Sequence, residues 1–409
     1  MRKLAIALSV LVLMIVAVPA MAFEITPNNP IDNGNFAKST ASCDGKFLIG
    51  QSGQNNVEVY THAGVYLNSF GAPSYQLSGF FGESLAVTPN CATAVVGAKG
   101  YDGTGAIFVF DWNASLGEYQ FVVKKTAAGL VPGDDFGQSV AVTDDGQTAF
   151  GASYLKNKVS SFARSASWTE HVVSMPDLSA SDYAGFALCV AGDDLGVGVP
   201  LQYNSGIPGA LYVHRKNTGG AGNWGYVTKF TGLERLGYSC GGSGPRFISG
   251  APLHNFDTLP PGSGAGQGQG VVVTFRRHVG GSYTVEHTFA PSLGFAECGT
   301  SVGISGINVM FGCPYADVGS VDDGKSNAFS RANGLGNWTS EFTLFDNDPQ
   351  VLDRVGFSCA VGGGEGIAGA PFSGEVATNA GAAYYNTYSL VFADGFEYGD
   401  TLEWSSAVP

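Results

Sequence analysis

Short runs of alternating apolar and polar residues recur along the whole chain, and turns rich in Gly, Asn and Asp separate them. Clear examples lie at 106–110 and 119–123, where Val, Phe and Tyr dominate. A period of two residues is that of a half-buried β-strand, because successive side chains point to opposite faces. No amphipathic helical stretch of useful length interrupts the pattern. The chain is therefore predicted to be all-β.

The predicted strands belong to a long internal repeat. FGESLAV at 81–87 is echoed by FGQSVAV at 136–142, and a second small-residue block, Gly97-Ala98 or Gly151-Ala152, follows about 14 residues after each motif glycine. Weaker copies keep a spacing of 13 residues. The seven copies are marked by Ala37, Gly82, Gly137, Gly185, Gly237, Gly299 and Gly356. Self-similarity at a mean period near 53 residues identifies a repeat architecture.

Each copy continues with a third segment of aromatic alternation, as at 210–213, 271–275 and 382–385, and a fourth where it can be read. Four short antiparallel strands per repeat of this length make the blade of a β-propeller. We therefore predict a seven-bladed β-propeller of four-stranded antiparallel blades over residues 23–388. The outermost strand of the seventh blade is either 390–392 or Phe23–Ile25, and the sequence leaves both open.

The pairing of F-G-x-S-V-A-V with G-A and a later G-A-I-F-V-F resembles the FG-GAP repeat. That repeat is known from the seven-bladed propeller at the head of integrin α chains and from many exported bacterial proteins. The resemblance is strongest over 81–110 and covers about residues 36–386. It implies the propeller fold and a tendency toward extracellular binding and adhesion. One fold hosts many roles, so the resemblance implies no particular ligand.

Members of that family often carry a calcium loop of the form D-x-D-x-D-G-x-x-D, and no segment here satisfies it. The closest acidic cluster combines Asp346, Asp348 and Asp353. The next contains Asp317, Asp322 and Asp323. Calcium takes six to eight oxygen ligands, so we expect solvated loops at both places. The prediction is that no cofactor is bound; calcium stays open as an alternative although its usual loop motif is absent, with Asp346, Asp348 and Asp353 as the candidate ligands.

Composition excludes some classes of protein. The sequence has 20 Lys+Arg against 34 Asp+Glu, a net charge of −14, and no basic stripe. Nucleic-acid binding needs Lys and Arg to neutralise phosphates, so a nucleic-acid partner is not expected. Aromatic residues make up 12% and charged residues only 13%, which argues against disorder because enough apolar surface can be buried.

The two ends of the chain carry their own signals. Arg2 and Lys3 precede an apolar run and then Pro19-Ala20-Met21-Ala22, the layout of a secretory signal peptide over 1–22. No later stretch is long enough for a membrane span. Residues 389–409 form a short acidic-aromatic tail, either a frayed end or a docking peptide. We expect a secreted, extracellular or cell-surface protein, with the periplasm as an alternative, and a monomer.

All seven cysteines follow the predicted signal peptide, where disulfides are permitted. Cys43 and Cys91 fall at equivalent first hairpins of neighbouring blades, so a bridge between them would join blades 1 and 2. Cys298 and Cys313 would face each other if their hairpin turned at Ser305-Gly306. That register makes them a hydrogen-bonded pair, whose wider Cα spacing suits a bridge less well. The remaining three are expected to be small buried residues: Cys189, Cys240 and Cys359.

No constellation of catalytic residues emerges. The string Gly299-Thr300-Ser301-Val302-Gly303 matches G-x-S-x-G, but its Ser lies in a predicted strand rather than at a strand-to-helix turn. The six histidines form no zinc-ligand pair. We predict no catalytic residues and a non-catalytic binding or adhesion propeller. The alternative is a polysaccharide-acting hydrolase or lyase with carboxylates at the channel mouth, and a third possibility is a purely structural surface protein.

The contact surface is predicted from the insertions. Segments 253–270 and 316–326 both join second to third strands, so they should emerge on one face. Loops on that face are expected to recognise an extracellular protein or glycan.

Overall fold

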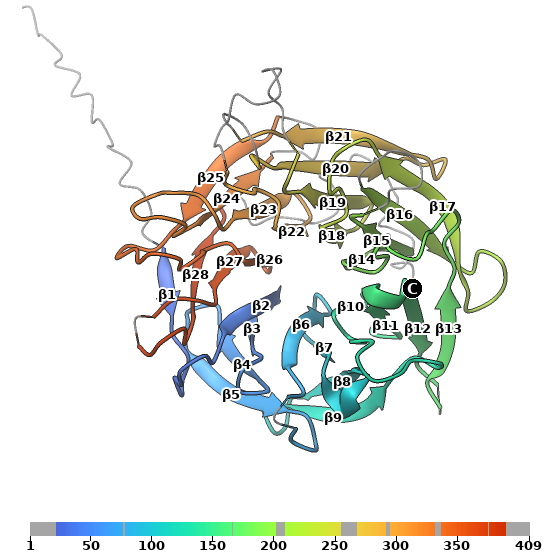
Figure 1. Ribbon diagram of the computed structural model, residues 1–409, viewed down its shortest axis with the longest axis horizontal. Helices are drawn as coiled ribbons and strands as arrows, with labels where there is room; N and C mark the ends of the chain where they lie inside the picture. Colours follow the sequence, from blue (N-terminus) through green and yellow to red (C-terminus); the bar gives the residue numbers. More distant parts are fainter. Residues whose placement is uncertain are drawn as a thin grey trace, which may run out of the picture.

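The computed structural model describes residues 22–76, 78–165, 167–201, 209–254, 268–291, 295–331, 337–374 and 376–389. These residues form seven four-stranded antiparallel sheets, arranged as blades around a central axis (Figure 1). The predicted seven-bladed β-propeller is confirmed. The expected signal peptide and C-terminal tail lie outside the described residues, apart from one residue of each. No helix of the described residues is long and apolar enough to cross a membrane.

In blades 1 to 6 the strands follow one another in sequence from the axis outward. Blade 1 contains β2 (Phe36–Cys43), β3 (Lys46–Gln51), β4 (Asn56–Thr61) and β5 (Tyr66–Gly71). Blade 2 contains β6 (Phe81–Val87), β7 (Thr93–Ala98), β8 (Ala106–Asn113) and β9 (Glu118–Lys125). Blade 3 contains β10 (Ser139–Val142), β11 (Thr148–Ser153), β12 (Lys158–Ala163) and β13 (Thr169–Val173). Blade 4 contains β14 (Leu188–Ala191), β15 (Asp194–Val199), β16 (Ala210–Lys216) and β17 (Trp224–Thr231).

Blade 5 contains β18 (Ser239–Ser243), β19 (Arg246–Ala251), β20 (Val271–Arg277) and β21 (Tyr283–Phe289). Blade 6 contains β22 (Ser301–Ser305), β23 (Asn308–Cys313), β24 (Lys325–Ser330) and β25 (Thr339–Leu344). Blade 7 contains β26 (Ser358–Gly362), β27 (Glu365–Ala370), β28 (Ala382–Thr387) and the N-terminal β1 (Phe23–Ile25). The 3-10 helices of the described residues follow the second strands of blades 2 and 3, as η1 (Tyr101–Gly103) and η2 (Tyr154–Lys156).

The N-terminal strand completes the ring. β1 pairs antiparallel with β28, placing Phe23 opposite Tyr385 and Ile25 opposite Ala383. The rings of Phe23 and Tyr385 stack with centroids 5.3 Å apart. Of the two strands that the sequence left open, Phe23–Ile25 therefore closes blade 7, while 390–392 lies outside the described residues.

The up-and-down strand order gives the propeller two faces. One, the hairpin face, carries the turns that join first to second and third to fourth strands. The other, the motif face, carries the starts of the first strands and the connections from second to third strands. The loops at 253–270 and 314–324 both leave from the motif face, as predicted, although 255–267 lies outside the described residues and Ser326 belongs to β24.

Backbone conformation explains why the repeat needs glycine. At the motif position φ is positive in all seven blades, with Ala37 at 62° and the glycines at 87–95°. A Cβ on Gly137 would lie 2.3 Å from the carbonyl oxygen of Ala106. The residue two before it also has positive φ in every blade: Asn35, Phe80, Asp135, Tyr183, Arg235, Glu297 and Arg354. Blade 1 alone accepts alanine, at the cost that left-handed φ imposes on a side chain.

The second small-residue block lets neighbouring blades approach closely. A Cβ added to Gly250 or Gly312 would lie 1.9 Å from the motif-position carbonyl oxygen of the next blade. In blade 3 the sequence suggested Gly151 for this role, but Ser139 pairs with Ala152, so Ala152 occupies the equivalent place. The Cβ of Ala152 lies against the motif glycine of blade 4, because a Cβ added to Gly185 would be only 2.5 Å from the Ala152 Cβ.

Serine hydroxyls link the blades near the same positions. In six blades the serine two residues after the motif position donates to the motif-position carbonyl of the next blade, at 2.5–2.9 Å. The donors are Ser39, Ser84, Ser139, Ser239, Ser301 and Ser358. Blade 4 has Ala187 at this position, so its link to Gly237 of blade 5 has no hydroxyl donor.

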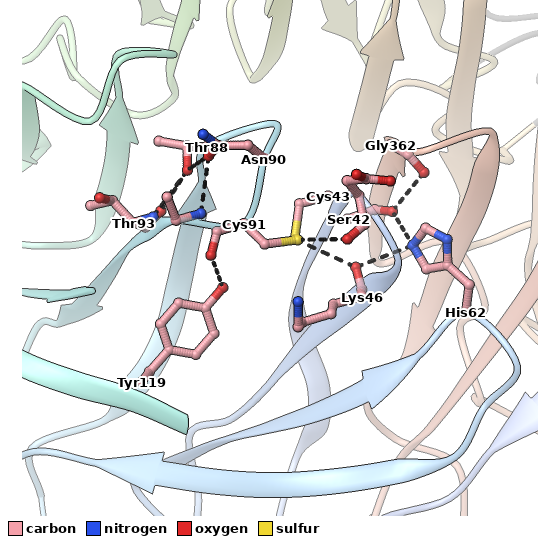
Figure 2. The surroundings of a disulfide bond; sticks show 12 residues. Ser42, Cys43, Lys46, His62, Thr88, Asn90, Cys91, Thr93, Tyr119 and Gly362 are labelled. Atoms are coloured by element: carbon pink, nitrogen blue, oxygen red, sulfur yellow. Dashed lines mark hydrogen bonds between the residues drawn. A yellow bond between two sulfur atoms is a disulfide. The ribbon is translucent and has the colours of Figure 1, made fainter. Parts of the chain in front are cut away.

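Three disulfides reinforce the ring. Cys43 of blade 1 is bonded to Cys91 of blade 2, with Cα atoms 5.3 Å apart, the inter-blade bridge that the hairpin positions suggested. Figure 2 shows its surroundings on the hairpin face. Beside it the Ser42 hydroxyl donates to the Gly362 carbonyl of blade 7 at 3.0 Å, and the Tyr119 hydroxyl donates to the Cys91 carbonyl at 2.9 Å (Figure 2). Bonds to three blades therefore meet here.

The expectation that Cys189 and Cys240 are unpaired small residues was wrong. They form a second inter-blade disulfide, with Cα atoms 5.8 Å apart, between the innermost strands of blades 4 and 5. Equivalent inner-strand positions in adjacent blades lie close together in space, although they are 51 residues apart in sequence. This bridge joins the two blades whose serine link is missing at Ala187.

The third disulfide joins Cys298 and Cys313 within blade 6. The expected register was wrong, because Ser305 pairs with Asn308 and the turn is Gly306-Ile307. In blades 1 and 2 the equivalent strand pair carries a bulge between the motif start and the serine, which shifts the register by two residues. Cys298 and Cys313 sit where blade 2 places Phe81 opposite Ala98, and their Cα atoms are only 4.0 Å apart.

Candidate functional site

The innermost strands of the seven blades line a cavity of about 280 Å³ on the propeller axis. Small and apolar residues dominate its wall, such as Ala86, Val190 and Gly303. Among the described lining residues the only carboxylate is Asp144, in the first hairpin of blade 3. Desolvation at the rim raises the pKa of Asp144, and the nearby Asp145 and Asp193 raise it further. The lining therefore contains no pair of facing carboxylates of the kind a channel glycosidase would use.

Aromatic side chains gather on the motif face, near the other end of the axis. This aromatic belt consists of residues just before a first strand or just after a second strand: Phe80, Tyr154, Tyr183, Phe186, Tyr238, Tyr315, Phe357 and Phe372. Phe80 is 40% exposed and the others are half-buried. Rings that are neither packed away nor fully solvated are suited to contact a ligand.

One arc of the belt crosses three blades without a break. Tyr154 of blade 3 contacts Tyr183 and Phe186 before β14, with ring centroids 5.1 and 5.3 Å apart. Phe186 in turn contacts Tyr238 of blade 5 at 4.7 Å. Burial, followed by the charge of Glu297, raises the pKa of Tyr238, so its hydroxyl stays protonated at neutral pH. This arc is a continuous run of aromatic rings, three of which carry hydroxyl groups.

Cations cover the second arc, over blades 6, 7 and 1. The Arg354 guanidinium lies 4.8 Å from the ring centroid of Tyr315 and 5.1 Å from that of Phe372. The Lys38 ammonium lies 4.2 Å from the Phe357 ring. Burial lowers the pKa of Lys38, and Lys99 and Arg354 lower it further against the opposing effect of Glu83. The belt therefore combines aromatic faces with positive charge, although the chain as a whole is acidic.

The strand order predicted this face from the sequence, but not its aromatic residues. Tyr238 and Phe357 both stand between the motif glycine and the serine, in Gly237-Tyr238-Ser239 and Gly356-Phe357-Ser358. Phe186 has the same place in blade 4, and an aromatic residue at a position that is Lys, Glu, Gln or Thr in the other four blades was the available signal. The contacts between blades could not be read from it, because they depend on how adjacent blades are aligned.

The structure places the suggested acidic residues in a hollow between blades 6 and 7, with a volume of about 650 Å³. Burial and the neighbouring Asp346 carboxylate raise the pKa of Asp353 to about 6. Asp353 accepts the Gln350 N–H at 2.6 Å, and Asp346 accepts the Asp348 N–H at 2.8 Å. Asp346 and Asp353 therefore come together, while Asp348 contributes its backbone. No three acidic, His or Cys side chains of the described residues are grouped to hold a metal ion.

Asp353 has a structural role that the repeat explains. Asp134 of blade 3 and Asp182 of blade 4 occupy the same place, two residues before the buried start of the motif. Asp134 accepts the N–H of Val131 at 2.7 Å and Asp182 that of Ser179 at 2.8 Å, each three residues earlier. These carboxylates hold the turn that leads into the first strand.

The other acidic cluster also turns inward to hold its loop. Asp323 accepts backbone N–H groups from Val318, Gly319 and Ser320 at 2.6–2.8 Å. Asp317 accepts the N–H of Asp322 at 2.9 Å. These bonds keep the 314–324 insertion ordered beside the aromatic belt.

Comparison with known proteins supports the fold and does not identify a family. No protein-family model matches the sequence, and no curated protein does. Among solved structures, the chain is similar to the β-propeller domain of Myceliophteria thermophila Cps50 (Swd1), with 11% identity and a TM-score of 0.56 over 88% of this chain and 99% of that one. It is similar to a streptogramin B lyase, with 12% identity and a TM-score of 0.55 over 90% and 97% of the two chains. Hydrazine synthase from Kuenenia stuttgartiensis aligns with 11% identity and a TM-score of 0.52 over 84% and 94%.

The protein is therefore a seven-bladed β-propeller, and identities this low carry the fold alone. Its three disulfides indicate an oxidising, extracytoplasmic environment.

Proposed function

We propose that this protein is an exported, non-catalytic binding propeller of the FG-GAP type, which recognises an extracellular glycan or protein through its motif face. The aromatic belt is the observation that carries the proposal. Aromatic and Arg side chains are enriched where proteins bind partners. An aromatic ring offers a large apolar contact area and loses little side-chain entropy when a partner binds. The segments after β19 and β23 leave from the same face, and the 314–324 insertion would extend the contact surface.

The test measures binding of the chain from residue 23 to residue 409 to arrays of glycans and extracellular matrix proteins. Tyr238→Ala and Phe357→Ala should each weaken binding roughly tenfold, as loss of a central aromatic contact does. Phe121→Ala is the matched control, because Phe121 is 45% exposed on the outer strand β9. Circular dichroism and the melting temperature must show that all three variants fold. Equal binding by the belt variants, or no binding to either array, would overturn the proposal.

A polysaccharide-acting hydrolase or lyase is the second candidate, because the hollow beside Asp353 combines a carboxyl group of raised pKa with room for a sugar ring. The hydrolase or lyase ranks second because Asp353 holds a turn, a structural role that Asp134 and Asp182 share. Release of reducing or unsaturated ends from acidic and neutral polysaccharides tests it. Activity that Asp346→Asn abolishes would establish the enzyme and displace the binding proposal.

A further inference from the structure

Two cations in the second arc of the aromatic belt have no anionic partner in the described part of the chain. Lys38 of blade 1 and Arg354, which precedes blade 7, are both half-buried, and neither makes an ion pair with a described residue. The Nε–H of Arg354 is buried and has no hydrogen-bond acceptor among the residues that the structure describes. A charge removed from water without a partner is unfavourable, so both side chains are suited to pair with a negatively charged ligand.

Aromatic rings join the two cations into one group. Lys38 Nζ lies 4.2 Å from the ring centroid of Phe357, whose ring packs against Phe372 with centroids 5.6 Å apart. The Cζ atom of Arg354 lies 5.1 Å from the Phe372 centroid and 4.8 Å from that of Tyr315. These five side chains, the cation–aromatic cluster, come from blades 6, 7 and 1 and include no acid.

Two acids that act on the charges of the cluster do not pair with them. Glu83 of blade 2 attracts Lys38, but its carboxylate pairs with Lys99 at 2.6 Å. Glu297, which precedes blade 6, makes no ion pair with a described residue. Burial raises the pKa of Glu297, against the opposing effect of Arg354. Direct contact with an anion is therefore left open to both cations of the cluster.

Blade 2 shows the same arrangement with its acid in place. Lys99 lies 5.4 Å from the Phe80 ring, as Lys38 lies against the Phe357 ring. The partner of Lys99 is Glu83, which stands directly after the motif glycine. That repeat position holds Lys38 in blade 1 and Phe357 in blade 7, so neither blade supplies an acid from it.

Three tyrosine hydroxyls in the first arc of the belt also lack protein partners. The rings of Tyr154, Tyr183 and Tyr238 make aromatic contacts, but their hydroxyls form no hydrogen bond with a described residue. A phenolic hydroxyl can both donate and accept. The belt therefore offers neutral polar groups, apolar rings and positive charge on one face.

We propose that the motif face recognises an acidic glycan, whose carboxylate or sulfate group binds Lys38 and Arg354 while its sugar rings pack on the half-exposed aromatic rings of the belt. This inference rests on the proposed function and names the ligand class of the same face. Ammonium and guanidinium groups form strong charge-assisted bonds with such anions. The C–H groups on one face of a pyranose ring are apolar and bury area against an aromatic ring. An acidic sugar carries its anion on such a ring, so one ligand matches both parts of the cluster.

The experiment titrates the chain of residues 23–409 with trigalacturonate, its fully methyl-esterified form, a heparin hexasaccharide and a glutamate hexapeptide. Isothermal calorimetry reports binding. We expect saturable binding of trigalacturonate, of the heparin hexasaccharide or of both, which distinguishes a carboxylate from a sulfate as the source of the anion. The methyl ester keeps the sugar rings and removes the charge, so it should bind about tenfold more weakly than the acid or less. The hexapeptide should bind no more tightly than the ester.

Lys38→Gln should weaken binding of the acidic oligosaccharide about tenfold and leave binding of the ester unchanged. Lys38→Arg keeps the charge and should retain most of the affinity. Lys46→Gln is the matched control, because Lys46 lies 4.4 Å from the Trp112 ring at the hairpin face. Circular dichroism and the melting temperature must show that the three variants fold.

The outcomes separate this inference from the proposed function. Equal binding of acid and ester, or equal effects of Lys38→Gln and Lys46→Gln, would overturn the inference and leave the proposed function standing. Tighter binding of the glutamate hexapeptide would also overturn it, in favour of an acidic protein partner. If neither acidic oligosaccharide binds while the arrays show another ligand, the inference alone fails. If neither these probes nor the arrays give binding, both fail.

Discussion

The hydroxyl of Ser358 in blade 7 donates a 2.9 Å hydrogen bond to the backbone carbonyl of Ala37 in blade 1. The same bond joins five other pairs of neighbouring blades, so the seam where the ring closes is built like the interfaces between consecutive blades. Since β1 also pairs with β28, the seam is held at both its inner and its outer edge.

Ser358→Ala should lower the free energy of unfolding by about 1 kcal/mol, because the Ala37 carbonyl loses its donor in a buried position. Urea unfolding followed by tryptophan fluorescence measures the change. Ser115→Ala, in an exposed hairpin, serves as the control and should change it by much less. An identical effect of the two substitutions would show that the hydroxyl link contributes nothing at the seam.

Ala187→Ser should have the opposite effect. The substitution supplies the hydroxyl that blade 4 lacks, within the same repeat position that donates in the other six blades. We expect a gain of roughly 0.5–1 kcal/mol in the free energy of unfolding, larger when the Cys189–Cys240 bridge is reduced. Chemical denaturation with and without reductant measures both values. A loss of stability would mean that the space at Ala187 is already filled.

Gly250→Ala should destabilise the fold by roughly 3 kcal/mol, because its Cβ would lie 1.9 Å from the Gly299 carbonyl oxygen and the two blades would have to separate. Gly280→Ala is the matched control, since nothing lies within 4 Å of a Cβ at that position. Melting temperatures of the two variants provide the comparison. Equal melting temperatures would contradict the close approach between blades 5 and 6.

The Asp346–Asp353 pair should make stability depend on pH. The pKa of Asp353 is raised from 3.8 to about 6. The contribution of Asp353 to the free energy of unfolding is therefore fully present below the pKa of the unfolded chain and is lost as the pH rises through about 6. Asp346→Asn removes the neighbouring charge and keeps an acceptor for the Asp348 N–H. The variant should be more stable than the wild type by about 1 kcal/mol near pH 8 and equal to it near pH 4.

Unfolding experiments at both pH values test this pH dependence. Asp317→Asn, in an exposed loop with the same type of backbone bond, controls for the general effect of removing a negative charge. A stability gain for Asp346→Asn that persists at the acidic pH would contradict the assigned cause.

Cys359 should resist alkylation in the folded protein. It is the free cysteine beside three disulfides, and burial raises the pKa of its thiol to about 11. The thiolate is the reactive form, so little of it exists near pH 8. Mass spectrometry after iodoacetamide treatment should find no label on the native protein and one label after unfolding without reductant. Rapid labelling of the native chain would show that the Cys359 thiol, which lines the cavity on the axis, reacts despite its raised pKa.

The fold could be predicted because repetition multiplies a weak local signal. Each copy around Gly82 or Gly299 is short, but φ must be positive at the same place in every blade, so glycine recurs at a fixed spacing. That the two long insertions leave from the motif face could be predicted from the strand order alone. The pairing of Cys189 with Cys240 could not be read from either segment, since both look like ordinary inner-strand residues and meet only when the blades are stacked.

The charged contact between blades 5 and 6 was beyond sequence reasoning for the same reason. Arg246 of β19 and Arg331, which follows β24, both donate to Glu286 of β21, and no spacing in the sequence relates these residues. The aromatic belt was partly visible in Tyr238 and Phe357. Its continuity depends on contacts between blades that the repeat pattern does not specify.

The pairing of Phe23 with Tyr385 also sets an order of events for folding. The first strand to be synthesised has its partner near the end of the chain, so the ring must remain open until the seventh blade exists. A chain that ends before blade 7 would therefore leave β1 without its partner strand β28. Closure of the ring, rather than completion of any single blade, is what gives every blade two neighbours.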